Sequence, residues 1–449
     1  MPVWGIETGG AVLDRLRECG GAKGVKDMNK KISIGIAVAL IIVTIAATYS
    51  VTMTIAMKDF NSLVSDLSER TDMYRSLSEI DQLARENYAN EIDEQLLSDS
   101  LASGYMAGLN DELSVYMTQS QLAGYERAAS GRETGIGVRI MESPYIETGY
   151  IYISRVYSDS PAENVGIERG EQIKSINGSS ISELGVDNAA ELLNSASGTS
   201  LALVIVDGDE ERQVNVVCGE YTVQTVFSEA VGEVGYIRIT GFDANTGSQF
   251  ANAVEEFAKL NITSLIIDVR NNSSDRFDYA APVIDQIVPA GTIASATYAD
   301  GTQSTLYTSD ANDISLPVAV LVNENTSGAA ELLACDLRDF GKAILIGEKT
   351  DGNGTVQELY TLGDGSAIKL TCATILPTNG TSYNGEGLEP DRVIEMSDSD
   401  IRYFEALAMA DDGQFQQAVS ELTGDSDGSG GETESETQAE VESESETAS

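Results

Sequence analysis

The sequence has no histidine among its 449 residues. This absence excludes Ser-His-Asp and Cys-His catalysis, and it excludes every zinc site with a histidine ligand. A serine paired with a lysine is one of the few hydrolytic arrangements that such a chain could still use. No metal ion and no other cofactor is expected.

Basic residues are scarce, with 27 Lys and Arg against 72 Asp and Glu and a formal net charge of −45. Because the phosphates of nucleic acids require a basic face, this balance argues against nucleic-acid binding. The excess of acid favours solubility and repels the protein from anionic surfaces, but it does not define a fold.

Cysteine is also rare, and the four residues Cys19, Cys218, Cys335 and Cys372 form no C-x-x-C motif. Neither a zinc site nor a dense disulfide framework is therefore indicated. Isolated thiols in the core are the simplest interpretation, although the sequence leaves a disulfide between Cys335 and Cys372 open.

One long apolar run lies near the N-terminus. Ile32–Met57 has 26 residues without a charge and follows Lys30 and Lys31. It is long enough to cross a bilayer and too long for the apolar core of a cleaved signal peptide, which is the alternative. The positive flank predicts a single-pass plasma-membrane anchor, with the N-terminus in the cytoplasm and the main domains outside. Whether the chain starts at Met1 or Met28 is left open.

After the apolar run, the pattern of apolar and polar residues changes twice along the chain. After the anchor, apolar residues recur at three- and four-residue steps, which predicts helices over 58–129. From Val234 onward strands alternate with helices, and Ser264–Val269 is apolar along its length, as buried parallel strands usually are. The last residues, from about Gly424, are rich in Gly, Ser, Thr and Glu and predict a disordered acidic tail.

Residues 130–222 hold two glycine-containing motifs. Gly135-Ile136-Gly137-Val138 opens a strand, and Ser158–Gly178 reads S-D-S-P-A-E-N-V-G-I-E-R-G-E-Q-I-K-S-I-N-G. Together they resemble a PDZ domain. The resemblance implies that the backbone N–H groups of the 135–138 loop bind the C-terminal carboxylate of a peptide, which adds a strand to the sheet. A degenerate domain that serves only as a spacer is the alternative.

Two further motifs are the most informative part of the chain. Asn325–Glu331 reads N-T-S-G-A-A-E, and Gly347–Gln357 reads G-E-K-T-D-G-N-G-T-V-Q. With the segment Arg338–Ala343, R-D-F-G-K-A, they resemble the carboxyl-terminal processing peptidases, also called tail-specific proteases. The resemblance runs from about Ala89 to Glu395. It implies a crotonase-like ββα core.

In that family the first motif carries a serine nucleophile and the second a lysine base. Anchoring the comparison on Glu331 and Gln357 requires no gap and places Gly328 and Asn353 at these positions. Glycine has no nucleophilic atom, and an amide does not take a proton at neutral pH. The resemblance therefore implies a retained framework, including Gln357, without the two reacting side chains.

The loop that would stabilise an oxyanion is altered as well. Asp268–Asp275 resembles the family's D-L-R-x-N-P-G-G, with Ser274 and Asp275 in place of the glycines. Those glycines let backbone N–H groups face the developing negative charge, and loss of such donors typically costs about 10²–10³ in rate. Asp275 is expected to place a carboxylate near that charge.

A shifted catalytic pair is the fallback hypothesis. Ser327 lies one residue before Gly328, and Lys349 lies four before Asn353. A one-residue step at the start of a helix turns a side chain by about 100°, and a base must lie within about 3 Å of the proton that it takes. Ser327 is more simply interpreted as a helix N-cap or turn residue.

The sequence thus predicts an α/β protein with a crotonase-like ββα peptidase core, an inserted PDZ domain, N-terminal helices and one transmembrane helix. The predicted limits are 1–31 for a cytoplasmic tail, 32–57 for the anchor, 58–129 for a helical region, 130–222 for the PDZ domain, 223–412 for the peptidase-like domain and 413–449 for the acidic disordered tail.

The predicted function is the binding of protein C-termini, or of an active partner protease, by a membrane-anchored and catalytically degenerate homologue of these peptidases. Two alternatives remain open: an active serine endopeptidase that processes exported proteins, and a structural cell-envelope scaffold. The sequence also leaves a homodimer open.

Overall fold

The computed structural model describes residues 48, 53, 71–143, 149–311 and 313–424. The chain divides into two compact units, residues 1–93 and residues 94–449. In the first unit, residues 71–87 form a helix with several exposed apolar side chains, among them Tyr74, Ile80 and Leu83.

The predicted anchor Ile32–Met57 lies outside the described residues except for Thr48 and Met53, and the predicted cytoplasmic tail lies outside them entirely. Within the described ranges, no helix is both long enough and apolar enough to cross a membrane.

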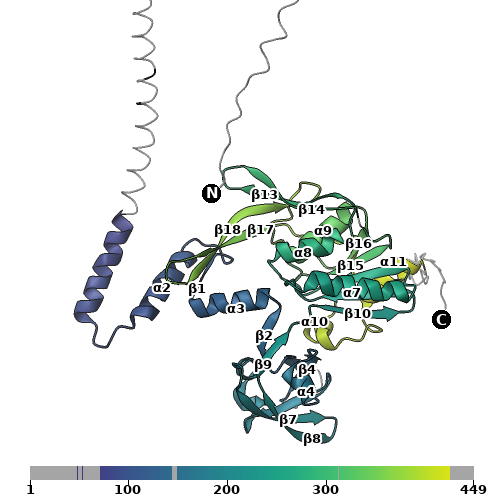
Figure 1. The fold of residues 1–449 in the computed structure, drawn as a ribbon, viewed down its shortest axis with the longest axis horizontal. Helices are drawn as coiled ribbons and strands as arrows, with labels where there is room; N and C mark the ends of the chain where they lie inside the picture. Colours follow the sequence, from purple (N-terminus) through teal and green to yellow (C-terminus); the bar gives the residue numbers. More distant parts are fainter. Residues whose placement is uncertain (1–47, 49–52, 54–70, 144–148, 312, 425–449) are drawn as a thin grey trace, which may run out of the picture. The chain divides into compact units, whose positions relative to one another are not determined.

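A six-stranded sheet forms the centre of the second unit (Figure 1). Its strands, in spatial order, are β10 (Val226–Val231), β11 (Val234–Ile239), β12 (Ser264–Asp268), β15 (Val318–Val322), β16 (Ala343–Gly347) and β19 (Arg392–Val393). Only β10 and β11 pair antiparallel, and the other neighbours are parallel. The alternation of strands and helices in the sequence is confirmed by this arrangement.

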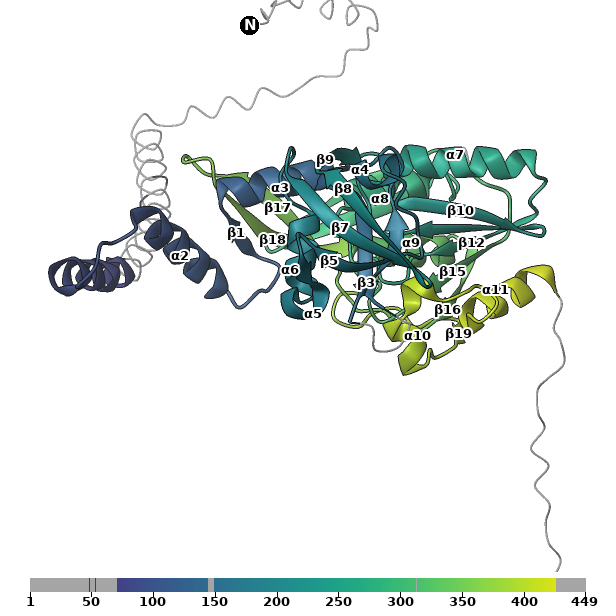
Figure 2. The same cartoon turned by 90° about the horizontal axis from the view of Figure 1, so that it is seen from below.

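Alternate residues of the central strands enter two different cores, because successive side chains of a strand point to opposite faces. Ile267 and Val320 pack in the larger core with α7 (Thr246–Lys259), α8 (Phe277–Asp285) and α9 (Ala329–Asp339). Ile266 and Leu321 pack on the other face against α11 (Gly413–Thr423). Figure 2 shows α7 and α11 on opposite sides of the sheet. Burial on both faces explains the nearly continuous apolar strands.

A second, antiparallel sheet stands beside the first. It contains β1 (Val115–Met117), β13 (Gly291–Tyr298), β14 (Gln303–Ser309), β17 (Thr355–Thr361) and β18 (Ala367–Leu376). The prediction of helix throughout 58–129 is wrong at β1, which separates α2 (Glu94–Ala107) from α3 (Gln119–Ala129). The residues of β1 pair with Lys369, Ile368 and Ala367 of β18, and this distant pairing outweighs the local helical pattern.

The predicted PDZ domain is inserted between α3 and β10. The chain enters through β2 (Arg132–Gly135) and leaves through β9 (Gly219–Thr222), and these two strands pair antiparallel (Figure 1). The domain contains β3 (Val138–Glu142), β4 (Ile151–Val156), β5 (Gln172–Ile176), β6 (Ser179–Ser180), β7 (Ser200–Asp207), β8 (Glu210–Val217), α4 (Pro161–Asn164), α5 (Ile181–Leu184) and α6 (Val186–Leu193).

Local features of this domain follow the sequence. Pro161 occupies the first turn of α4, where its missing N–H is not needed, and the Ser160 hydroxyl caps the helix by accepting a hydrogen bond from the Glu163 N–H. Asn177 and Gly178 both have positive φ, of 53° and 86°, in the turn between β5 and β6. Asn177-Gly178 thus forms a tight turn between the two strands.

The C-terminal segment continues further than predicted. Residues 413–423, assigned to the disordered tail, form α11. Asp412 caps this helix through the N–H groups of Gln414 and Phe415, Phe415 is buried against the sheet, and Gly424 ends the helix with a left-handed φ of 75°. The caps at Asp412 and Gly424 and the burial of Phe415 stabilise this helix. Residues 425–449 lie outside the described ranges.

The open question about the cysteines is resolved for the described residues. Cys218, Cys335 and Cys372 are free thiols. The Cys335 thiol donates to the Asp339 carboxylate, whereas the Cys372 thiol donates to the Leu370 carbonyl.

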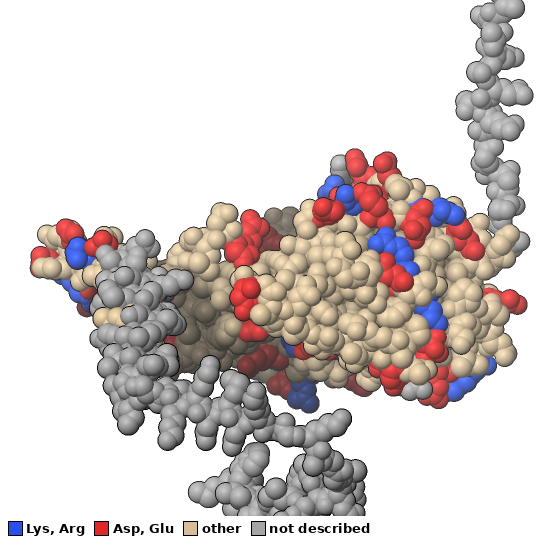
Figure 3. Space-filling model, turned by 90° about the horizontal axis from the view of Figure 1, so that it is seen from above, with Lys and Arg blue, Asp and Glu red and all other residues tan. Residues whose placement is uncertain are grey.

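On the face drawn in Figure 3, acidic side chains are more numerous than basic ones, in line with the composition of the chain.

Candidate functional site

The turn between β15 and α9 holds Gly328. Its backbone angles are φ 66° and ψ −117°, in a region that residues with a Cβ rarely enter. The Thr326 hydroxyl holds the turn in place. It accepts the Asn323 N–H within the turn and donates to the Val269 carbonyl just after β12. The residue at the predicted nucleophile position therefore lies at a sharp, glycine-dependent bend at the start of a helix.

Glu331 brings the two predicted catalytic positions together. One of its carboxylate oxygens accepts both the Gly328 N–H, at 3.0 Å, and the Asn353 N–H, at 2.8 Å. The other oxygen accepts the Gly352 N–H and the Thr350 hydroxyl. Glu331 is fully buried, and this burial raises its pKa although the four hydrogen bonds act in the opposite direction. Positions 328 and 353, separated in the sequence, are thus neighbours.

Neither Gly328 nor Asn353 has a hydroxyl group or an amine in its side chain. At Gly328 there is no side chain, and a Cβ placed there would lie 2.5 Å from the carbonyl oxygen of Ser274. At Asn353 the side-chain oxygen accepts from the N–H and the hydroxyl of Thr355, at 3.3 and 2.7 Å. The amide is therefore used to hold its own loop.

The loop that carries Ser274 presents a carbonyl rather than an N–H group to this turn. The Ser274 carbonyl accepts the Ala329 N–H at 2.8 Å. The N–H groups of Ser327 and Gly328 are also engaged, with the Asn272 carbonyl and the Glu331 carboxylate. An oxyanion hole needs preorganised donors that are free to meet the substrate, and these three donors already have partners inside the protein.

Asp275 is paired with a lysine that the sequence motifs do not reveal. Lys369 of β18 lies with its Nζ 2.7 Å from a carboxylate oxygen of Asp275, and both side chains are largely buried. The carboxylate near the expected oxyanion position is therefore neutralised by a neighbour. The pairing joins residues 94 positions apart, so that no local pattern in the sequence could indicate it.

The residues of the fallback hypothesis do not meet. Ser327 is buried, and its hydroxyl donates to the Asp351 carboxylate at 2.7 Å. Lys349 instead forms an exposed ion pair with Glu389, at 2.6 Å. No Ser327–Lys349 pair is assembled in this arrangement, and the serine serves to connect the two loops.

Gln357 lines a cavity of about 420 Å³ beside the altered loop. Its side-chain N–H group donates to Thr355, whereas its Oε1 is buried without a partner among the described residues. Three tyrosines line this cavity, namely Tyr125, Tyr279 and Tyr307. Asp275 and Arg276, which follow Ser274 in the chain, line it as well. A hollow thus persists beside the altered site.

A buried ionic network supports this end of the sheet. Arg270 donates to both carboxylate oxygens of Asp268 and to both of Asp412, which lies just before α11. Burial favours neutral groups, but these contacts outweigh it, so that the pKa of Asp268 is lowered. Sequence comparison singles out Asp268 and Arg270, and it misses Asp412 because that residue lies 142 positions away.

The predicted carboxylate-binding loop of the PDZ domain is tightly packed. The Ile136 N–H donates to the Leu193 carbonyl at the end of α6, at 2.9 Å, and Ile136 is fully buried. The Ile136 N–H, one of the expected carboxylate donors, is therefore already bonded within the domain. Gly137 has φ 81°, and a Cβ there would lie 2.3 Å from the Ser160 Cβ, which explains the need for glycine.

Comparison with known families matches both folded parts. Residues 233–394 match the model of Peptidase family S41, and residues 127–206 match the PDZ domain. The geometry and these matches define an S41-type peptidase domain with an inserted PDZ domain.

Individual relatives agree with this class. The chain is similar to the carboxy-terminal processing protease CtpA of Bacillus subtilis, with 28% identity over 80% of this chain and 77% of that protein. It is 29% identical to CtpB of the same organism, over 76% of this chain and 70% of that protein. The chain is therefore a homologue of C-terminal processing serine peptidases.

Among solved structures, a Bacteroides fragilis protein described as an S41 protease has the same fold. It is 18% identical, covers 75% of this chain and 93% of its own, and gives a TM-score of 0.52.

Proposed function

We propose that this chain is a catalytically inactive homologue of the C-terminal processing peptidases that binds protein C-termini. In this proposal it is anchored through Ile32–Met57, with its folded domains outside the cytoplasm. The observation that carries the proposal is the geometry at Gly328. A residue without a side chain occupies the nucleophile position, and the Ser274 carbonyl fills the adjacent space.

Three further features support inactivity. The residue at position 353 is an amide that bonds to Thr355, the nearest turn N–H groups are internally bonded, and Ser327 has a carboxylate rather than an amine as its partner. An active endopeptidase would require this whole region to rearrange. The hollow beside Gln357 and the PDZ domain both suit binding without cleavage, of a protein C-terminus or of a partner protease.

The PDZ domain supplies the recognition in this proposal. Because the Ile136 N–H is bonded to Leu193, the carboxylate would be met by the N–H groups of Gly137 and Val138 at the start of β3. The peptide would then add a strand beside β3. A purely structural scaffold, in which neither site is used, is the alternative that binding measurements separate from this one.

Calorimetry with the full-length chain tests the proposal. We expect a peptide with a free C-terminal carboxylate to bind with a Kd on the order of micromolar, or about −8 kcal/mol. Amidation of that peptide removes charge-assisted hydrogen bonds and should weaken binding by at least about 1.5 kcal/mol.

Two glycine variants provide a matched comparison. Gly137→Ala crowds Ser160 and should weaken acid-peptide binding about tenfold or more, whereas Gly178→Ala, at a positive φ with open space around it, should leave binding unchanged. Equal binding of acid and amide peptides, or no binding across a diverse library of C-termini, would leave the spacer interpretation of the domain.

A further inference from the structure

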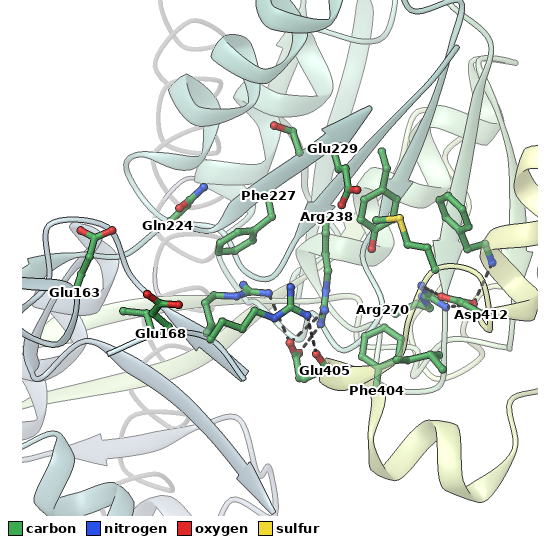
Figure 4. A pocket seen from close by; sticks show the side chains of 18 of the residues that line it. Glu163, Glu168, Gln224, Phe227, Glu229, Arg238, Arg270, Phe404, Glu405 and Asp412 are labelled. Atoms are coloured by element: carbon green, nitrogen blue, oxygen red, sulfur yellow. Dashed lines mark hydrogen bonds and ion pairs between the residues drawn. The ribbon is translucent and has the colours of Figure 1, made fainter. Parts of the chain in front are cut away.

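The carboxylate of Glu405 lies where three parts of the chain meet (Figure 4). It belongs to the C-terminal strap, which we define as residues 398–407 and which contains α10 (Asp398–Arg402) and η1 (Phe404–Ala406). Arg238 of β11 donates to both carboxylate oxygens, at 2.5 and 3.2 Å. Arg155 of the PDZ domain lies 3.6 Å from one of them.

A cavity of about 610 Å³ adjoins this carboxylate and is lined by the PDZ domain, the strap and the central sheet. Aromatic rings hold the guanidinium groups in place. Arg155 lies over the Phe227 ring at 3.4 Å, and Arg238 lies over the Phe404 ring at 4.6 Å. Planar groups held in this way lose little further freedom when they bind an anion.

Inside the cavity, the largely buried guanidinium groups of Arg155 and Arg238 share the single carboxylate of Glu405. Arg155, Arg169 and Arg238 all line the cavity, and Arg169 reaches the Glu405 carbonyl at 3.4 Å. Arg270 also lines it, but its charge is matched by Asp268 and Asp412. In a chain with only 27 basic residues and a net charge of −45, two largely buried guanidinium groups that share one carboxylate are a local excess of positive charge.

Two of these guanidinium groups have unused donors. The Nη1 of Arg155 and the Nε of Arg238 are buried without a hydrogen-bond partner among the described residues. The two side chains are only 13% and 11% exposed. Unpaired buried donors on charged groups are costly and are normally satisfied. Burial lowers the pKa of Arg155 to about 10, so that it stays charged at neutral pH.

Acidic residues also line the cavity, but they lie at its exposed rim. Glu163, Glu168 and Glu229 are all exposed to solvent, and Glu163 already accepts the Asp159 N–H. Water and salt screen these exposed charges, whereas the buried guanidinium groups act through a medium of lower dielectric constant. In Figure 4, Glu163 and Glu229 lie apart from the Arg238–Glu405 pair.

We propose that this cavity is a binding site for a small dianion, either a phosphate or a dicarboxylate, that competes with Glu405 for Arg155 and Arg238. The exchange involves only ion pairs and hydrogen bonds. A dianion offers more acceptor oxygens and more negative charge than the single carboxylate of Glu405. Binding would loosen the contact of the strap with Arg155 and thereby one link between the PDZ domain and the central sheet. The cavity lining contains neither the 135–138 loop nor position 328.

Calorimetric titration of the full-length chain with inorganic phosphate, succinate and acetate at constant ionic strength tests this proposal. We expect saturable binding of phosphate or succinate and at least about tenfold weaker binding of acetate, which has one negative charge. Binding of phosphate alone would assign a phosphate-type ligand, and binding of succinate alone would assign a dicarboxylate.

Three variants and one control variant make the test specific. Arg155→Gln should weaken dianion binding about tenfold or more. The affinity of Arg155→Lys should lie between those of the natural chain and Arg155→Gln, because lysine keeps the charge but not the planar donors. Glu405→Gln should strengthen binding about tenfold, since the internal competitor loses its charge. Arg402→Gln is the matched control, because Arg402 belongs to the same strap but pairs with Glu142 on the surface, outside the cavity lining.

The direction of the Glu405→Gln effect separates binding from mere structural damage. A variant that only disturbed the fold would bind more weakly and unfold at a lower temperature, without tighter binding. No saturable binding of either dianion would overturn the proposal. So would affinity that is unchanged in Arg155→Gln, or affinity that does not rise in Glu405→Gln while circular dichroism shows the native fold.

Discussion

The double variant Gly328→Ser/Asn353→Lys is expected to show no measurable peptidase activity, although it restores both reacting side chains. A Cβ at position 328 would lie 2.5 Å from the Ser274 carbonyl oxygen, which is closer than two such atoms can approach. The positive φ adds about 1–2 kcal/mol of strain for a residue with a side chain. The serine therefore fits only if the 272–276 loop moves.

That loop is held in its present form by several contacts. The Ser274 hydroxyl accepts the Arg276 N–H, the Asn272 side chain accepts the Ser274 N–H, and Asp275 is tied to Lys369. While they persist, the Ala329 N–H stays bonded to the Ser274 carbonyl. Preorganised donors are usually the largest electrostatic contribution to such catalysis, and their loss costs about 10²–10³ in rate.

The quadruple variant that adds Ser274→Gly and Asp275→Gly should gain activity, because both side-chain tethers are gone and the peptide can turn its N–H toward the site. Cleavage of a fluorescently labelled unstructured protein measures the gain. The matched control keeps Gly328 and carries the other three changes, and it should remain inactive. Strong cleavage by the double variant alone would show that the Ser274 carbonyl does not block the site.

A second large effect is expected from Asp336, a fully buried residue of α9. One carboxyl oxygen accepts the Thr378 N–H at 3.0 Å, and the other has no partner among the described residues. Burial, with a smaller contribution from the charge of Asp339, raises the pKa of Asp336 to about 8. The fold therefore favours the protonated form at neutral pH.

The stability of the fold should fall as the pH rises through this range. Below about pH 4 the carboxyl group is protonated in both the folded and the unfolded chain. Between about pH 4 and pH 8 the unfolded chain releases the proton while the folded chain keeps it, so that unfolding becomes easier by up to about 1.4 kcal/mol per pH unit. Above about pH 8 this contribution levels off.

Asp336→Asn imitates the protonated carboxyl group and should remove this pH dependence. We expect the variant to exceed the natural chain in unfolding free energy by several kcal/mol at pH 9 and by far less at pH 5, as measured by urea unfolding. Asp209→Asn, an exposed change in the turn between β7 and β8, is the control and should show no such difference. A constant offset between pH 5 and pH 9 would mean that Asp336 is ionised in the fold.

The features that local sequence could predict are those set by nearby residues. Apolar runs such as Ser264–Val269 predict the buried strands, and Pro161 and Asn177-Gly178 fix a helix start and a turn. The ungapped spacing of the two motifs marks positions 328 and 353 as a pair, and both backbone N–H groups bond to Glu331.

The features that it could not predict depend on distant partners. Pairing with β18 makes 115–117 a strand, packing of Phe415 makes 413–423 a helix, and Lys369 neutralises Asp275. The direction of the Ser274 carbonyl likewise depends on how the 272–276 loop packs against the start of α9, where the Ala329 N–H donates to it. The meeting of Arg155, Arg238 and Glu405 spans residues 155 to 405, so that only the folded chain reveals it.

Mass spectrometry of an unstructured substrate, incubated with the purified full-length chain, tests the central claim most directly. The account predicts that neither the natural chain nor its Ser327→Ala variant forms cleavage products above those in substrate incubated alone, because neither Gly328 nor Asn353 can perform the reaction and Lys349 is paired elsewhere. Turnover that Ser327→Ala abolishes would contradict the account and establish a shifted catalytic serine. Turnover that survives this change would contradict it equally, by revealing an unrecognised active site.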